Sequence, residues 1–542
     1  MPPPAVLVIS QPHALTADGW STAGHPLSMS TVTQTLRAQP AWNPEDPDFW
    51  SRYGRAVALR NLVFVIPAMA LSFAVWMLWS VLVVHLPAAG FRYSTNQLFW
   101  LSALPALCGA TLRIFYGLAL PWVGGRRWTV LSTASLLLPA GGIAWAVQDP
   151  NTPYETMVLL SLLCGLGGAN FASGVAHISA CFPVHEQGTA LGIGAGFAHL
   201  GVGLAQWLVP AGIALNLFDL TGQAGQAGQA VWLANAGLIW LPLIVLASLA
   251  AWWGMNDVQS GRLSLQDQAQ VFTHRHSWLM GWLYLGSFGS FIGFAAAYPL
   301  LLSQQFPALE TAQQLVWLGP LLGALMRPAG GWLADHLGGA RVSLVAFAVL
   351  VLGVFGVFAS LGAGGRPGLF VASFVLLFGA AGLANGSTFR MIPAGFLRGV
   401  PSADAETLRD TQARGAAALG LCSAIGAYGG FFIPKIFGSA FALSGGPQAA
   451  FQGSKTLTAP AVRPGAGPVR AAGPCPGFRP SGRPAAASCR RARPGDRLPC
   501  ARAGRGGETP ANDRGWPPGS PHGDPRRDAG TGGHASAGAG GE

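Results

Sequence analysis

Long apolar stretches separated by short polar loops make up most of the chain from Asn61 onward. A helix of about 20 apolar residues is long enough to cross the hydrocarbon core of a bilayer. The pattern predicts an all-α polytopic membrane protein with about eleven spans. The predicted spans are residues 61–86, 97–119, 128–147, 155–181, 188–213, 230–254, 277–304, 312–333, 342–363, 368–392 and 413–438.

A polar stretch at residues 256–276 divides these spans into two groups. Six predicted spans precede it, within residues 42–255, and five follow it, within residues 277–452. Many transporters are built from two such repeated halves. We therefore expect an N-terminal bundle, a cytoplasmic central loop and a C-terminal bundle. Residues 1–41 and 453–542 are predicted to be a disordered N-terminal extension and a disordered tail.

Two short sequences repeat at corresponding positions in the second and eighth spans. Arg113 closes the sequence Gly-Ala-Thr-Leu-Arg, and Arg327 closes the sequence Gly-Ala-Leu-Met-Arg. A Gly-Gly pair follows each arginine at the same distance, beginning at Gly124 in the first copy and at Gly338 in the second. This correspondence between the two groups of spans indicates an internal repeat.

The composition excludes an ordinary soluble protein. Only 10% of the residues are charged, against roughly 25% in soluble domains. The net charge of +11 comes mainly from residues 453–542, where 14 Lys and Arg against 6 acidic residues give a surplus of 8 and leave +3 elsewhere. The charge therefore predicts no nucleic-acid partner. The sequence contains no recognisable nucleophile–base set, metal-ligand cluster or phosphate loop, so we predict neither an enzyme nor a metal or cofactor.

The basic residues predict the orientation of the spans. If the spans alternate in direction, one end collects Arg52, Arg55, Arg60, Arg126, Arg127, Arg262, Arg275, Arg341, Arg398, Arg409 and Arg414. The other end has little beyond Arg92, Arg366 and Lys435. Cytoplasmic loops of membrane proteins carry the excess of Lys and Arg. The N-terminus and the central loop are therefore predicted to be cytoplasmic.

Arg113 and Arg327 each lie inside an otherwise apolar span. An arginine at that depth costs about 3 kcal/mol or more and by default marks a functional site. Acidic partners are scarce, because Glu155 and Asp219 lie near span ends and Asp335 lies in a loop. Pairing with backbone carbonyls is the structural alternative. A guanidinium is planar and donates in a fork, so the pair predicts a small planar anion such as nitrate, nitrite, formate or bicarbonate.

Longer sequences carry a resemblance to a known family. They are Trp-Asn-Pro-Glu-Asp-Pro at 42–47, the glycine-rich stretch 165–173, and the stretches 288–294 and 424–435. From about Trp42 to Pro447 the chain resembles the NarK-type nitrate/nitrite porter family of the major facilitator superfamily. The resemblance implies a major facilitator fold of two six-helix bundles in the bacterial inner membrane. It also implies a monomer in the lipid bilayer that transports nitrate and nitrite without a cofactor.

The resemblance implies roles for individual residues. One arginine from the second span and one from the eighth clamp the anion in the family, and these positions are Arg113 and Arg327 here. A tyrosine of the seventh span, here Tyr284, donates a further hydrogen bond. Two phenylalanines, here Phe171 and Phe288, sandwich the planar anion. Without the resemblance, core or lipid-facing packing would be the simpler interpretation of either phenylalanine.

The resemblance further implies signature or gating positions at Asn170, Ala195, Gly196, His199, Gly201, Gly426, Gly429 and Asp335. The chain departs from the family at two of its positions, because Ala198 and His199 stand where the family usually has Gly and Asn. Histidine titrates near neutral pH, so proton coupling stays open beside the simpler role of a neutral substitute for Asn. Arg390 also stands where relatives have a neutral residue.

The similarity ends near Phe451, where relatives have a twelfth helix and this chain has a tail rich in Pro, Gly and Arg. The tail is typical of a GC-rich gene translated out of frame, and a basic tail that binds anionic lipid or RNA is the alternative. We predict nitrate/nitrite antiport by alternating access, with the twelfth span lost. Proton-coupled nitrate symport, a nutrient sensor and a non-functional truncated porter are the alternatives.

Overall fold

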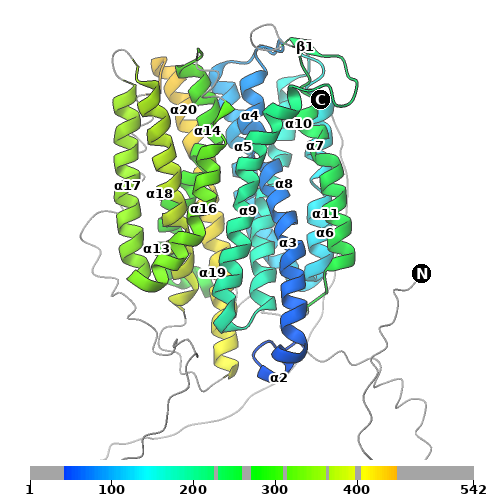
Figure 1. The fold of residues 1–542 in the computed structure, drawn as a ribbon, viewed down its shortest axis with the longest axis vertical. Coiled ribbons are helices and arrows are strands. Elements are labelled where there is room, and N and C mark those ends of the chain that lie inside the picture. Colours follow the sequence, from blue (N-terminus) through cyan, green and yellow to red (C-terminus); the bar gives the residue numbers. More distant parts are fainter. Residues whose placement is uncertain are drawn as a thin grey trace, which may run out of the picture. The chain divides into compact units, whose positions relative to one another are not determined.

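Helices long enough to cross a membrane dominate the computed structural model of the chain (Figure 1). The structure describes residues 42–224, 230–258, 270–308, 314–361, 365–396 and 405–447. The first half contains α2 (Pro47–Phe49), the π-helical turn η1 (Trp50–Gly54), α3 (Arg55–Trp76), α4 (Leu78–His85), α5 (Thr95–Val123), α6 (Gly125–Ala134), α7 (Leu137–Ala146), α8 (Tyr154–Cys181), α9 (Val184–Ile213), α10 (Asn235–Leu238) and α11 (Trp240–Gly254). The second half contains the 3₁₀ turn η3 (Val271–Thr273), α13 (Arg275–Tyr284), the π-helical turn η4 (Leu285–Gly289), α14 (Ser290–Gln305), α16 (Leu318–Leu333), the π-helical turn η5 (Ala334–Gly338), α17 (Gly339–Ser360), α18 (Pro367–Ala394), α19 (Ala405–Ala427) and α20 (Gly429–Ser444).

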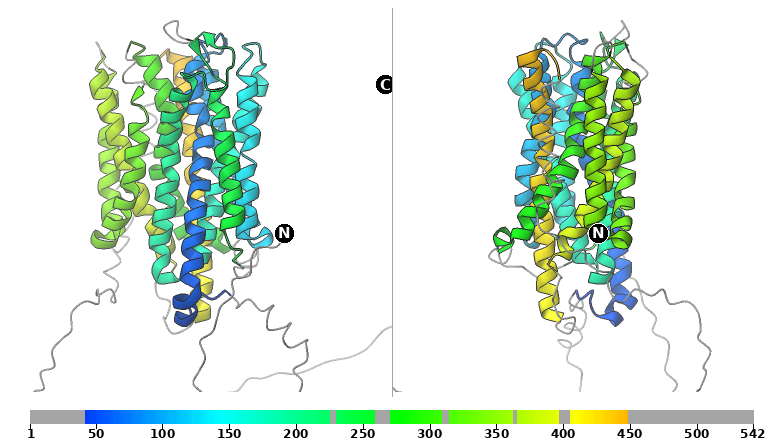
Figure 2. Two further views of the ribbon diagram at one scale, coloured as in Figure 1. Left: turned by 45° about the vertical axis from the view of Figure 1, so that its right-hand side comes forward. Right: turned by 90° about the vertical axis from the view of Figure 1, so that its left-hand side faces the viewer.

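The number of membrane crossings agrees with the hydrophobic pattern. Within the described ranges, 10 helical stretches are long and apolar enough to cross a membrane. One of them, Leu318–Ser360, has 43 residues, which is about 64 Å of helix and twice the hydrocarbon thickness. Gly338, with a φ of 90°, breaks this stretch between η5 and α17. Counting it as two crossings gives 10 + 1 = 11 within the described ranges, as predicted. Figure 2 shows the helices from two further directions.

Some helix ends differ from the predicted spans. The first span extends back to Pro47, because the Asp46 carboxylate caps α2 by accepting hydrogen bonds from two backbone N–H groups. The sixth begins at Asn235 rather than at residue 230, because strand β2 (Ala230–Val231) pairs antiparallel with β1 (Gln223–Ala224). The predicted disordered segments, and the position where relatives have a twelfth helix, lie outside the described residues.

The two copies of the internal repeat share a backbone form. Gly124 follows α5 with a φ of 91°, and Gly338 follows η5 with a φ of 90°. Residues other than glycine rarely adopt this backbone conformation. Each glycine stands 11 residues after its arginine (124 − 113 and 338 − 327). The same turn therefore ends both arginine-bearing segments.

Asp257 of the central loop supplies an acid to the first copy, where Pro121 stands in the place of Asp335. Its Oδ1 accepts a hydrogen bond from the backbone N–H of Arg126 at 3.0 Å. Its Oδ2 lies 3.5 Å from Nη2 of the same arginine. A carboxylate at this position caps the first turn of α6. The contact fastens the beginning of the central loop to the turn after α5.

Glycines allow α8 to pack closely against α3 and α5. A Cβ on Gly167 would lie 2.2 Å from the carbonyl oxygen of Ser72, and a Cβ on Gly165 would lie 2.7 Å from the backbone nitrogen of Gly109. Small residues at helix crossings bring membrane helices this close. The short distance exposes the α8 backbone to side chains of α5.

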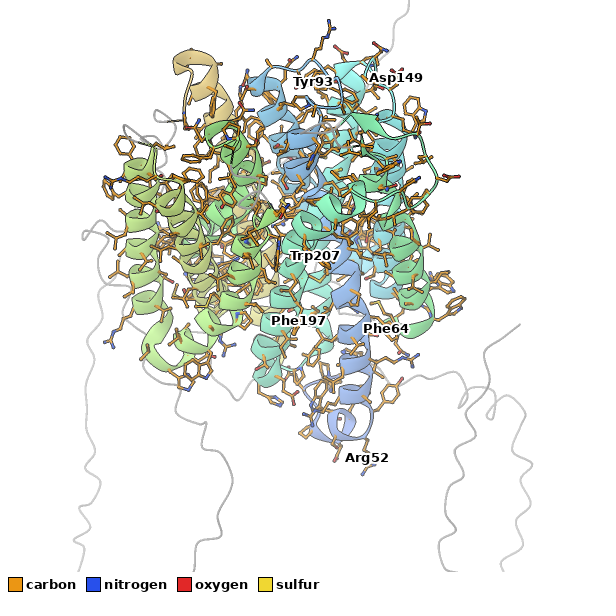
Figure 3. The ribbon with its side chains drawn as sticks, turned by 45° about the horizontal axis from the view of Figure 1, so that its top comes forward. Arg52, Phe64, Tyr93, Asp149, Phe197 and Trp207 are labelled. Atoms are coloured by element: carbon orange, nitrogen blue, oxygen red, sulfur yellow. The ribbon has the colours of Figure 1, made fainter. Side chains whose placement is uncertain are left out.

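Basic residues lie at one end of the helices, which we call the basic end. Figure 3 shows Arg52 at this end and Tyr93 and Asp149 at the opposite end. α13 begins at Arg275, and α6 begins immediately before Arg126. Basic residues from different loops therefore lie at the same end, as expected for spans that alternate in direction.

Candidate functional site

Arg113 lies in the middle of α5 and is fully buried. Its Nε donates to the carbonyl oxygen of Gly168 at 2.8 Å, and its Nη1 donates to the carbonyl oxygen of Ser423 at 2.7 Å. Its Nη2 is buried with no hydrogen-bond partner. Pairing with backbone carbonyls, the structural alternative for this arginine, therefore accounts for Nε and Nη1. Nη2 is left free to bind a ligand.

Arg327 lies in α16 and is 3% exposed. Its Nη1 lies 2.8 Å from Nε2 of His199, and its Nη2 donates to the hydroxyl of Tyr284 at 3.3 Å. Its Cζ lies 4.6 Å from the centre of the Phe389 ring. The partners of this guanidinium are thus a histidine, a tyrosine and an aromatic face, with no carboxylate among them.

Two phenylalanine rings connect the arginines. Phe171 and Phe288 are nearly parallel, with an interplanar angle of 16° and ring centres 6.1 Å apart. Cζ of Arg113 lies 5.0 Å from the first ring centre and 5.1 Å from the second. Phe288 stands in the π-helical turn η4, and such turns occur often at functional sites. The five predicted substrate-binding residues therefore form one buried cluster.

Neither arginine forms an ion pair within the described part of the chain. The ion pairs found there join Asp257, Glu186 or Asp335 to basic residues elsewhere. Two buried cations without a carboxylate form a strongly electropositive site. The chemistry that this arrangement can perform is the binding of a small anion.

Signature positions on α9 contribute close helix contacts and one hydrogen bond. A Cβ on Gly201 would lie 1.9 Å from the carbonyl oxygen of Ala70, and a Cβ on Gly196 would lie 3.1 Å from Cγ of Pro328. The carbonyl oxygen of Ala195 is hydrogen-bonded to Nδ1 of His199. These small residues let α9 lie between α3 and α16, where it presents His199 to Arg327.

Signature glycines of α19 and α20 lie against η4. A Cβ on Gly426 would lie 2.6 Å from Cδ1 of Tyr284, and a Cβ on Gly429 would lie 2.3 Å from Cα of Gly289. Both positions have too little space for a side chain. They allow the end of α13 to bring Tyr284, and η4 to bring Phe288, to the arginines.

Two further signature residues take other positions. Asn170 donates from Nδ2 to the hydroxyl of Ser72 at 2.8 Å, while its buried Oδ1 has no partner. Asp335 lies outside the cluster and forms an ion pair with Nε of Arg390 at 2.7 Å. A Cβ on Gly188 of α9 would clash with that guanidinium. Arg390 therefore links η5 to α9 at the basic end.

Sequence reasoning missed several contributors to the cluster. Trp76 lies 5.2 Å from Cζ of Arg113, and Phe389 lies over Arg327. The carbonyls of Gly168 and Ser423 bind Arg113. Any residue type can supply a backbone carbonyl, so residue identity does not predict such a contact. Only the glycine-rich stretch of α8 pointed to the carbonyl of Gly168.

The sequence pattern of the Major Facilitator Superfamily matches residues 64–434. The chain belongs to this superfamily and is a multi-pass membrane transporter rather than an enzyme. The human organic anion transporter MFSD10 has a similar fold, with a TM-score of 0.50 at 15% identity, over 76% of this chain and 99% of that one.

Bacterial relatives narrow the assignment from the superfamily to one family within it. The chain is 45% identical over 425 residues to the nitrate/nitrite transporter NarU of Salmonella typhimurium, covering 76% of this chain and 91% of that protein. It is 36% identical over 429 residues to the probable nitrate/nitrite antiporter NarK2 of Thermus thermophilus, covering 76% and 92%. Within the superfamily, the chain is a member of the NarK-type nitrate/nitrite porter family, as its sequence resemblance predicted.

Proposed function

We propose that this protein exchanges nitrate for nitrite across the bacterial cytoplasmic membrane, with the anion held between Arg113 and Arg327. The observation that carries the proposal is the pair of buried guanidiniums without a carboxylate in the described part of the chain. Relatives at 45% and 36% identity are named as a nitrate/nitrite transporter and a probable antiporter. Their names support this choice of anion.

The hydrogen-bond donors of the site suit an incoming oxyanion. Nη2 of Arg113 has no partner, and the donors of Arg327 point at the neutral side chains of His199 and Tyr284. An anionic oxygen attracts a guanidinium N–H more strongly than a neutral acceptor does, because opposite charges also attract each other. A nitrate oxygen therefore competes well for these donors.

The rings favour a flat anion. Phe171 and Phe288 have centres 6.1 Å apart. A planar anion between them needs about 7 Å, twice an ordinary contact distance of about 3.5 Å. The rings have to part by at least about 1 Å to admit nitrate or nitrite, because the distance between ring centres is the largest separation that the ring planes can have. Tetrahedral sulfate or phosphate would require a larger opening.

Both arginines also bridge the two bundles. Arg113 of the first bundle donates to Ser423 of the second, and Arg327 of the second contacts His199 of the first. Rocking of the bundles has to break such bonds, which leaves buried cations unpaired when the site is empty. A bound anion compensates the charge in both conformations. Obligatory exchange follows, because the loaded carrier crosses more easily than the empty one.

The basic end is assigned to the cytoplasm, because cytoplasmic loops carry the excess of Lys and Arg. The N-terminal Arg52 and the central loop then face the cytoplasm, and Asp149 faces the periplasm. A single chain holds both arginines of the clamp, so we propose that the working unit is a monomer.

The test is uptake of labelled nitrate into proteoliposomes that contain the purified chain. We expect uptake only when the vesicles are loaded with nitrite or nitrate, and no uptake when they are loaded with sulfate. External nitrite should compete strongly. Competition by formate and bicarbonate measures how far the site distinguishes among planar anions.

Two results would change the proposal. Uptake driven by a pH gradient, without an internal anion, contradicts antiport and establishes proton-coupled symport. No uptake by the 542-residue chain, together with uptake by a chain whose C-terminal reading frame has been restored, establishes a truncated porter.

A further inference from the structure

A second cavity, separate from the arginine cluster, lies in the C-terminal bundle and has a volume of about 280 Å³. Three parts of the chain form it: the beginning of α13, the turn after α18 and the first half of α19. The lining residues are His274, His276, Gly395, Phe396, Thr411 and Arg414. The proposed transport of nitrate uses none of these six residues.

The cavity lies where three membrane spans end. The spanning stretches that meet there are Arg275–Gln305, which begins at the cavity, Pro367–Ala394, which ends at it, and Arg414–Leu443, which begins at it. α13 and the beginning of α19 lie at the same end of the molecule as α2, which is the basic end (Figure 1). The cavity is therefore at the level where lipid headgroups border the hydrocarbon core.

Aromatic contacts and one hydrogen bond form the wall of the cavity. Nε2 of His276 lies 3.1 Å from the carbonyl oxygen of Ile392. A Cβ on Gly395 would clash with the same imidazole, so the turn after α18 comes this close only because it has no side chain there. The rings of His274 and His276 stand edge to face with Phe396, at 5.5 and 5.6 Å between centres.

Positive charge and hydrogen-bond donors line the cavity. Arg414 takes no part in the ion pairs of the described ranges. An imidazole has at least one N–H in each of its protonation states, and no carboxylate is among the six lining residues. The lining therefore suits an anionic group. The volume is close to the lower limit of roughly 300 Å³ for small-molecule pockets, which is enough for a phosphate headgroup and too little for a whole lipid.

Exposed aromatic side chains beside the cavity favour a lipid over a soluble anion. Phe272 is 45% exposed, Trp278 53% and Trp282 46%. Nε1 of Trp278 donates to the carbonyl oxygen of Phe272 at 2.8 Å. The two tryptophans stand four and eight residues after His274 and share one face of α13. Tryptophan is enriched where the bilayer meets water, so acyl chains can lie along this face while the headgroup enters the cavity.

We propose that this cavity binds the phosphate of an anionic phospholipid, with Arg414 as its cation and His274 as a hydrogen-bond donor. Basic pockets between spans on the cytoplasmic side are typical sites for such headgroups. The bound lipid connects the basic ends of α13, α18 and α19. The proposal concerns a site apart from the arginine cluster and does not depend on which anion the protein transports.

The test is native mass spectrometry of the purified 542-residue chain with added phosphatidylglycerol, and with phosphatidylcholine as the zwitterionic comparison. We expect the native protein to prefer phosphatidylglycerol. Arg414→Gln should raise the Kd for phosphatidylglycerol about fivefold, the usual effect of one basic residue near an anionic lipid surface. Arg341→Gln is the matched control, because Arg341 is an exposed arginine of α17 in the same bundle, outside the cavity lining. It should leave the Kd unchanged.

His274→Leu provides a second variant on the exposed side of the cavity. It removes a hydrogen-bond donor and should also raise the Kd about fivefold. Thermal unfolding in phosphatidylcholine shows that each variant is folded.

Three results would overturn the lipid site. The first is equal binding of the two lipids by the native protein. The second is the same Kd for Arg414→Gln and Arg341→Gln, which would mean that only the general charge of the basic end attracts the lipid. The third is displacement of phosphatidylglycerol by millimolar inorganic phosphate, which would assign the cavity to a soluble phosphate.

Discussion

Arg113 and Arg327 occupy equivalent repeat positions but have different kinds of partners. Arg113 donates to two backbone carbonyls, of Gly168 and Ser423, which hold it in one orientation. Arg327 contacts the side chains of His199 and Tyr284 instead. Both arrangements use the fork of the guanidinium rather than its charge alone.

Arg113→Lys and Arg327→Lys should each lower kcat/KM for nitrate at least about tenfold, although the charge is kept. A lysine cannot donate in a fork, and each charge-assisted hydrogen bond is worth roughly 1.5–3 kcal/mol. Nitrate uptake into nitrite-loaded proteoliposomes measures the effect. Arg127→Lys is the control, because that side chain is 66% exposed at the basic end. Near-native exchange by either Arg113→Lys or Arg327→Lys would contradict the proposal that the two arginines clamp the anion.

Helix α19 packs closely against the site at Gly426, which has no side chain. Gly426 faces Tyr284 and Phe288, and the space between the helices accommodates no side chain there. Six residues earlier in the same helix (426 − 420), Gly420 has open space beside it, with nothing within 4 Å of a Cβ. The two glycines therefore separate the effect of helix propensity from the effect of close packing.

Gly426→Ala should lower nitrate exchange about tenfold, because its Cβ would lie 2.6 Å from Cδ1 of Tyr284 and 3.2 Å from Cδ1 of Phe288. The displaced tyrosine loses its hydrogen bond to Arg327, and overpacking costs about 1–3 kcal/mol. Gly420→Ala should exchange nitrate normally. The assay is uptake with thermal unfolding of both proteins. Equal behaviour of the two variants contradicts the packing argument.

The basic end of the helices is predicted to face the cytoplasm, because cytoplasmic loops carry the excess of Lys and Arg. Arg52 and Asp149 are exposed side chains at opposite ends of the helices (Figure 3). They are therefore suitable reporters of the side of the membrane on which each end lies.

With the seven native cysteines replaced by alanine, Asp149→Cys should react with a membrane-impermeant maleimide in intact spheroplasts. Arg52→Cys should react only after the membrane is opened. Retained nitrate exchange shows that each labelled protein is folded. The reverse pattern of labelling would place the basic end outside the cell and would require the assignment of both faces to be exchanged.

Much of this protein follows from its sequence, because the bilayer acts on properties that are local along the chain. Span length and apolar composition predict the eleven crossings, and the arginine repeat at Arg113 and Arg327 predicts where charge is buried. The family resemblance adds Tyr284, Phe171 and Phe288. Their roles in anion binding stay predictions, whereas their meeting in one cluster is a feature of the structure.

Only the tertiary structure decided which distant groups meet. Arg327 contacts His199 across 128 residues, and Asp257 caps α6 across 131 residues. No local pattern encodes such pairs, because they depend on which helices of the two bundles lie side by side and how closely their glycines let them approach. The chain by itself determined its membrane crossings and its buried charges. The packing of the bundles decided that Arg113 contacts the backbone carbonyls of Gly168 and Ser423, and that Arg327 contacts His199.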